Sequence, residues 1–193
     1  MTYAIEAARY AAQVYATRES VQNYKTALEL CELTSEKSPD LKATLLLELG
    51  ELYKYVAMFD EAIAMYEQIL GIDEGGFTET IRTYALDGIG DVHMARGDYD
   101  QALRCYKSVE DMAAARQDKK LLIEVWTDFT DLFFRLSMDA AAKGLKEEEN
   151  KNRAKSQEYA ERVIKQSEPM EMVSVRFWPS CVEGMQLLGV LLF

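Results

Sequence analysis

Residues 49–66 read LGELYKYVAMFDEAIAMY, and residues 89–106 read IGDVHMARGDYDQALRCY, a second copy displaced by 40 positions. The positions that keep their residue class at this offset are Gly50 and Gly90, Phe59 and Tyr99, Ala62 and Ala102, and Tyr66 and Tyr106. Chance is a poor explanation for so many matches at one offset. A fixed period of about 20–50 residues is typical of stacked structural repeats. Such chains present a long surface rather than a single pocket, so the pattern favours binding over catalysis.

Each copy contains two amphipathic helices. Leu46, Leu49 and Tyr53 are spaced by three and four residues, which places them on one face of a helix. After a break at 58–60, a second apolar stripe comprises Ala62, Ile63, Tyr66, Ile69 and Leu70. A glycine inside a helix costs about 1 kcal/mol relative to alanine, so Gly50 predicts that another helix approaches its backbone closely. Small residues facing large aromatic ones indicate an antiparallel hairpin, which needs stacked neighbours to bury both stripes.

These residues resemble the tetratricopeptide repeat, whose pattern is Trp-x2-Leu-Gly-x2-Tyr, then Ala-x3-Phe and then Pro. The first copy matches with Leu46-x2-Leu49-Gly50-x2-Tyr53 and Ala62-x3-Tyr66. The second matches with Leu86-x2-Ile89-Gly90-x2-His93 and Ala102-x3-Tyr106, and Gly97-Asp98-Tyr99 is similar to that family's turn between paired helices. No closing proline follows either copy, and the 40-residue period exceeds the usual one of about 34. The resemblance therefore implies a long-period member of the family.

The resemblance implies an all-α fold, a right-handed superhelical solenoid of antiparallel helix pairs. We expect a single domain over residues 1–193, with repeats at about 4–38, 41–75, 81–118 and 120–168 and a terminal helix at about 173–193. In the last pair, Trp126-x2-Phe129-Thr130-x2-Phe133 is followed by a charged stretch at 146–155, which indicates either an insertion or two overlong helices. The apolar terminal segment is either a single closing helix or the cut edge of a longer array.

Composition and charge argue against several classes of function. The 193-residue chain has a formal net charge of −11, which opposes binding to the phosphate backbone of a nucleic acid. No stretch approaches about 18 consecutive apolar residues, so neither a membrane span nor a membrane partner is expected. Cys31, Cys105 and Cys181 are expected to be buried free thiols, which indicates a reducing, cytoplasmic location.

Catalytic and cofactor motifs are not recognised. The glycine-rich stretch at 71–76 lacks the lysine and the Ser or Thr of a phosphate-binding loop. Gly88 and Gly90 lie inside an expected helix rather than after a strand, which excludes a dinucleotide site. The single histidine, His93, takes the place of Tyr53 and is interpreted as a half-buried core residue, and no Cys/His spacing fits zinc. We therefore expect no enzyme, no cofactor and no metal.

In the tetratricopeptide repeat the first helix of each pair lines a concave groove, which implies a binding face here. Setting aside the core stripes leaves the predicted groove residues Leu47, Glu48, Glu51, Tyr55, Tyr84, Asp87, Asp91, Met94, Asp128 and Asp131. Each first helix thus turns carboxylates toward the groove, beside apolar and aromatic side chains. The pattern predicts an acidic groove for a basic or amphipathic peptide or helix of a partner protein. The alternative is that these acids only solvate an exposed helix face.

Chaperone cofactors of this family hold a peptide carboxylate in a basic clamp. The matching positions here are Leu47, Glu51, Gly88, Glu124 and Asp128, none of which is basic. The favoured function is therefore a scaffold or adaptor for protein–protein interaction with a different ligand. The alternative is a sensory or regulatory repeat segment of a larger multidomain signalling protein, of cyclase, ATPase or transcription-regulator type. Homodimerisation through the apolar segments Ala4–Tyr15 and Met185–Phe193 is a separate hypothesis.

Overall fold

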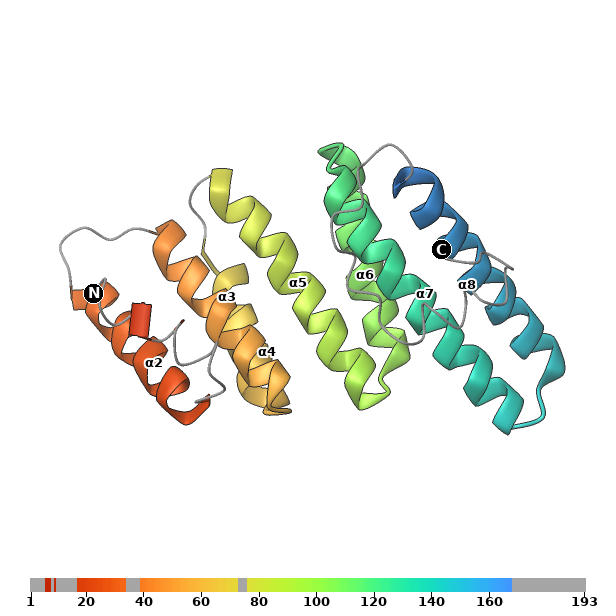
Figure 1. Cartoon of the computed structure of the whole chain (residues 1–193), viewed down its shortest axis with the longest axis horizontal. Coiled ribbons are helices and arrows are strands. Elements are labelled where there is room, and N and C mark those ends of the chain that lie inside the picture. Colours follow the sequence, from red (N-terminus) through yellow and green to blue (C-terminus); the bar gives the residue numbers. More distant parts are fainter. Residues whose placement is uncertain (1–5, 8, 10–16, 34–38, 73–75, 168–193) are drawn as a thin grey trace, which may run out of the picture. The chain divides into compact units, whose positions relative to one another are not determined.

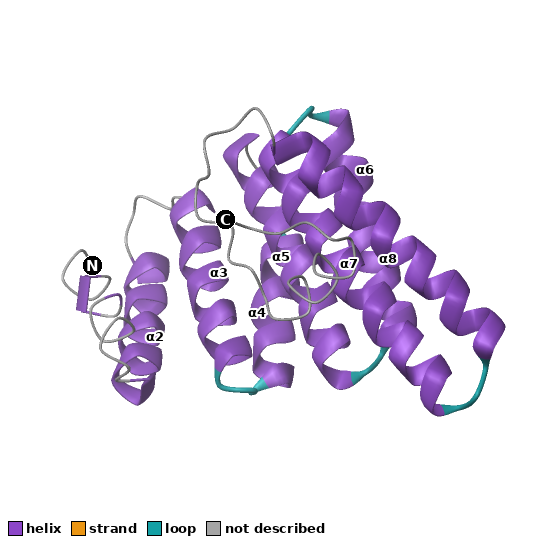
Figure 2. Cartoon of the chain, turned by 45° about the vertical axis from the view of Figure 1, so that its right-hand side comes forward, coloured by secondary structure: helices purple, strands orange, loops and turns teal. Residues whose placement is uncertain are grey.

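The computed structural model describes residues 6–7, 9, 17–33, 39–72 and 76–167, which are mainly helical (Figures 1 and 2). The helices are α2 (Thr17–Leu33), α3 (Pro39–Tyr55), α4 (Phe59–Leu70), α5 (Gly76–Arg96), α6 (Tyr99–Ala115), α7 (Lys119–Ala142) and α8 (Lys146–Ser167). No strand occurs in this described part, which confirms the all-α class. None of the described helices combines the length and the apolar character needed to cross a membrane.

The chain divides into two compact units, residues 1–92 and 93–193, with the boundary inside α5. The pairs α3–α4, α5–α6 and α7–α8 overlap the expected repeats at 41–75, 81–118 and 120–168, whose limits stay a prediction. The expected terminal helix at 173–193 lies outside the described residues. In the expected repeat at 4–38, so do residues 34–38 and, apart from residues 6, 7 and 9, residues 4–16.

In the first unit, a tyrosine ring occupies the space between two glycines. α3 packs against both α2 and α4, and Tyr66 of α4 is fully buried. A Cβ atom on Gly50 of α3 would lie 2.6 Å from Tyr66 Cε1, and one on Gly88 of α5 would lie 2.6 Å from Tyr66 Cζ. Real Cβ atoms do not approach other atoms this closely. The close approach expected at Gly50 therefore occurs, and Gly88 shares it.

In the second unit, α7 packs against α6 and α8 around an aromatic cluster. Phe129 of α7 stacks on Tyr159 of α8, with ring centroids 4.5 Å apart, and meets Tyr106 of α6 edge to face at 5.9 Å. Both are preferred geometries for aromatic pairs. α7 has 24 residues and α8 has 22, compared with 17 and 12 in α3 and α4. The charged stretch at 146–155 is therefore part of an overlong helix rather than an inserted loop.

The same turn follows four of these helices. Ala57, Gly97, Gln117 and Gly144 have positive φ angles of 59°, 81°, 55° and 73°. After α3, the N–H of Ala57 donates to the carbonyl of Lys54 at 3.1 Å and the N–H of Met58 donates to that of Tyr53 at 2.9 Å. Equivalent bonds follow α5, α6 and α7. This Schellman arrangement satisfies the last carbonyl groups of a helix, so each connection is short.

Candidate functional site

The predicted groove residues of the first unit lie along one side of α3 and one side of α5, because residues spaced by three and four positions share a side of a helix. We call the combined surface the α3–α5 face; it comprises Leu47, Glu48, Glu51 and Tyr55 of α3 and Tyr84, Asp87 and Asp91 of α5. The Tyr55 side chain is prominent because the residue is 72% exposed. Glu51 is also exposed, and the other members are half-buried.

Lys54 joins the two helices of this face. Its Nζ lies 2.9 Å from Glu51 Oε2 on the same helix and 2.7 Å from Asp91 Oδ2 on α5. Burial alone would lower the pKa of the Lys54 ammonium, but the carboxylates of Asp91 and Glu51 outweigh it and raise that pKa above its ordinary value. Two carboxylates predicted to attract a cation of a ligand therefore already hold a cation of the chain itself.

A buried residue of the core, Tyr66, also binds the Glu51 carboxylate. The hydroxyl of Tyr66 donates to Glu51 Oε1 at 2.7 Å, and the Tyr66 ring is confined between Gly50 and Gly88. Burial, and then the neighbouring Glu51 carboxylate, raises the pKa of the Tyr66 phenol, so the hydroxyl stays protonated and keeps donating at neutral pH. The packing of three helices thus fixes the position of this surface carboxylate.

Glu48 pairs with a second cation of the chain. Arg9 Nε lies 3.1 Å from Glu48 Oε1 and Arg9 Nη2 lies 2.7 Å from the same oxygen. Arg9 Nε also contacts Oε2 at 3.2 Å, so the guanidinium meets both carboxylate oxygens. Nearby, burial raises the pKa of Tyr24 to about 12, and the charge of Glu48 acts in the same direction. The α3–α5 face therefore accommodates a guanidinium as well as an ammonium.

The remaining predicted acids lie on α7, in the second unit. Asp131 Oδ2 accepts a hydrogen bond from Arg135 Nε at 2.9 Å, one turn along the helix. Asp128 is half-buried. Glu124 Oε1 lies 3.6 Å from Lys120 Nζ. Burial raises the pKa of the Glu124 carboxyl, although the charge of Lys120 acts to lower it. α7 thus presents an acidic side that basic residues of the same helix partly neutralise.

Met94 differs from the other predicted groove residues, because its side chain is buried. The residue is only 8% exposed. α5 buries two opposite sides, one with Ile81, Ala85 and Val92 and the other with Thr83, Gly90 and Met94. The sequence suggested a single core stripe for this helix, and Met94 belongs to the second one.

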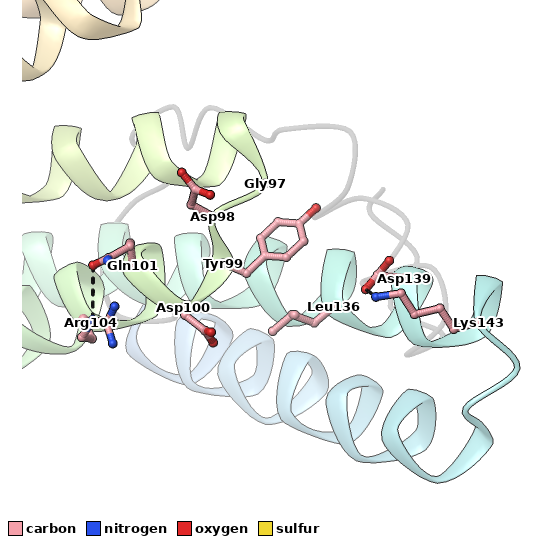
Figure 3. Close-up of a pocket in the computed structure, with 9 residues that line it drawn as sticks. All are labelled: Gly97, Asp98, Tyr99, Asp100, Gln101, Arg104, Leu136, Asp139 and Lys143. Carbon is pink, nitrogen blue, oxygen red and sulfur yellow. Dashed lines mark hydrogen bonds and ion pairs between the residues drawn. The ribbon is translucent and has the colours of Figure 1, made fainter.

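The second unit also contains a shallow hollow of about 650 Å³, between the start of α6 and the last turns of α7 (Figure 3). Asp139 and Lys143 on its wall pair at 2.6 Å, and Arg104 donates to the side chain of Gln101 at 3.3 Å. The hollow contains no predicted groove residue. Because its charges are mixed, it provides no concentrated site for an ion.

The His, Cys, Asp and Glu side chains of the described residues do not gather into a metal site. In that part of the chain, no group of three or more His, Cys, Asp or Glu side chains could hold a metal ion. His93 is half-buried, as expected, and its Nδ1 lies 3.6 Å from Asp98 Oδ2 at the turn after α5.

Comparison with protein families identifies the repeat. A family model described as "Tetratricopeptide repeat" matches residues 45–76 and 85–120. These two segments contain the two copies that define the 40-residue period of the sequence. No curated protein matches the sequence.

Three solved structures are similar in fold. BtubC (BKLC) from P. vanneervenii has a TM-score of 0.69 at 16% identity, over 87% of this chain and 62% of that one. A putative kinesin light chain with nearly identical TPR-like repeats, from Podosopora anserina, has a TM-score of 0.55 at 15% identity, over 97% and 82%. MamA has a TM-score of 0.50 at 15% identity, over 90% and 97%. At these identities the likeness shows the helical-repeat fold alone, and this chain spans under two thirds of the length of BtubC.

Proposed function

We propose that the chain is a scaffold or adaptor that binds a basic, amphipathic segment of a partner protein. The chain belongs to the tetratricopeptide repeat family, whose repeats serve protein–protein interaction. In the first unit the proposed binding surface is the α3–α5 face. In the second unit it is the acidic side of α7 with Asp128 and Asp131. Met94 is not part of either surface, because it is buried.

The proposal rests on the meeting of carboxylates from two helices beside an exposed aromatic ring. Glu51 of α3 and Asp91 of α5 lie 2.9 and 2.7 Å from one ammonium group, so together they can hold a single cation. Tyr55 lies one turn beyond Glu51 on the same side of α3 and is 72% exposed. Tyrosine is enriched at protein interfaces because its ring offers apolar area with a polar tip. A segment with both basic and apolar side chains would engage both features.

Charge favours a basic partner over an acidic one. The α3–α5 face carries four acids, Glu48, Glu51, Asp87 and Asp91, and the chain sets Arg9 and Lys54 against them. These acidic side chains outnumber the two basic ones, in agreement with the formal net charge of −11 for the whole chain. Electrostatic attraction of this kind accelerates association and weakens with added salt, because the screening length falls to about 8 Å at physiological ionic strength.

The test is a calorimetric titration with a short synthetic peptide in which arginine alternates with leucine. Neutralising the face with E51Q and D91N together is expected to weaken binding about tenfold, because two charges that contact the ligand are lost while side-chain shape is kept. The matched control is E61Q with E67Q, two exposed acids on α4 of the same unit. Equal affinity in both double variants would show that these acids only solvate the helix.

A further inference from the structure

Lys54 occupies the point at which a cation of the proposed ligand would bind. It contacts one carboxylate from each helix of the α3–α5 face, Glu51 and Asp91. Its side chain is 23% exposed, so the bridge is accessible from solvent. A ligand cation can reach both carboxylates only if the ammonium of Lys54 leaves them.

Arginine is the side chain best suited to make this exchange. Its planar guanidinium has five N–H donors and binds carboxylates bidentately, whereas the lysine ammonium is a compact charge on a flexible stem. The chain itself provides an example on the same face, because the guanidinium of Arg9 contacts both oxygens of Glu48. A guanidinium is also more weakly hydrated than an ammonium, so it loses less on leaving water.

The receiving carboxylate keeps its place when Lys54 leaves. Glu51 accepts a hydrogen bond from the Tyr66 hydroxyl at 2.7 Å, and the Tyr66 ring is fixed between Gly50 and Gly88. The position of Glu51 therefore depends on the core and not on Lys54 alone. A site that stays ordered during the exchange loses little conformational entropy on binding.

We propose that Lys54 is a built-in competitor, which an arginine of the partner displaces from Glu51 and Asp91. This inference rests on the proposed function and deepens it, since it names the partner residue and the step that limits affinity. Lys54 stabilises the free repeat by linking α3 to α5, and it weakens binding of every basic ligand. An arginine at this position is favoured over a lysine, because a guanidinium loses less hydration on leaving water and offers more donors to the two carboxylates.

The test compares K54M, which removes the charge, with the unchanged chain, using the arginine–leucine peptide and a lysine–leucine peptide of equal length. K54M is expected to bind the arginine peptide about fivefold more tightly, the scale of one partly exposed ion pair. Its melting temperature without peptide should be lower, and peptide should raise that temperature more than in the unchanged chain. The control is K42M, because Lys42 of α3 pairs with Glu32 of α2 at 2.8 Å, an ion pair without any member of the α3–α5 face.

The outcomes separate the two proposals. If the unchanged chain binds neither peptide, the proposed function fails and the competitor role fails with it. If the unchanged chain binds but K54M binds equally or more weakly, the function stands and the competitor role is overturned. An equal gain in K42M would also overturn it, since a general charge effect would then suffice. Should K54M not fold, K54Q removes the same charge while keeping hydrogen-bond donors, and the same outcomes apply.

Discussion

Gly50 and Gly88 leave room for one side chain, the ring of Tyr66. The sequence predicted the close approach at Gly50, because a glycine within an apolar helical stripe is otherwise unfavourable. It did not predict the one at Gly88, since only the stacking of α5 brings that residue to the other side of the ring. Nor did it predict the bridges from Lys54 to Asp91 and from Arg9 to Glu48, which join residues 37 and 39 positions apart in the chain. Pairs at such separations depend on packing and leave no local pattern.

Alanine at either glycine should therefore destabilise the first unit. G50A and G88A each place a Cβ 2.6 Å from the Tyr66 ring, and such overpacking typically costs about 1–3 kcal/mol, more than the helix propensity gained. Urea unfolding followed by circular dichroism measures the change. G71A is the control, because a Cβ there would come no closer than 3.6 Å to a neighbour. Equal stability of all three variants would contradict the packing of Tyr66 between the glycines.

At the scale of helices and turns, periodicity indicated an all-helical chain, because each helix buries a stripe at helical spacing. The turn after α5 was also expected, since Gly97 suits the positive φ that it adopts. The equivalent turn after α3 uses Ala57, which gives no such signal. The lengths of α7 and α8 could not be decided from sequence, because a charged stretch fits a solvated helix and an inserted loop equally well.

The two turns should respond to glycine and alanine in opposite ways. A57G relieves a left-handed conformation that costs an L-residue about 1–2 kcal/mol, and the added flexibility of the unfolded chain offsets about half of this gain. We expect A57G to raise the free energy of unfolding by about 0.5–1 kcal/mol and G97A to lower it by about as much. Thermal unfolding of the two variants checks the pair. Destabilisation by A57G would show that the turn after α3 is not the one described.

Glu110 links three helices of the second unit. The residue is 8% exposed, and its carboxylate accepts hydrogen bonds from Trp126 Nε1 and Lys107 Nζ, each at 2.8 Å, and from Arg162 Nη1 at 3.4 Å. E110Q replaces one acceptor oxygen by a donor, so we expect a loss of about 1–3 kcal/mol of unfolding free energy. The adjacent D111N is the control, since that side chain is 68% exposed. Similar unfolding midpoints for both would exclude the linking role.

At the scale of the whole chain, 33 acidic residues outnumber 22 basic ones, and this excess is what favours a basic partner. The acids of the proposed surfaces are partly neutralised, because Arg9, Lys54 and Arg135 each form an ion pair with one or two of them. Attraction should therefore be weaker than the sequence suggests, and selectivity should come from exchange of ion pairs. Each of the two units has its own acidic surface, and each surface is a separate candidate site for the ligand.

The measurement that tests the central claim most directly is a residue-resolved titration of the isotope-labelled chain with the arginine–leucine peptide, followed by amide chemical shifts. The account predicts that the largest changes occur at Glu51, Tyr55 and Asp91, with a second set at Asp128 and Asp131. Amides of α4 and α8 should change little, because these second helices lie outside both proposed surfaces. Largest changes on α4 or α8, or in the hollow between α6 and α7, would contradict the account, as would the absence of any change at saturating peptide.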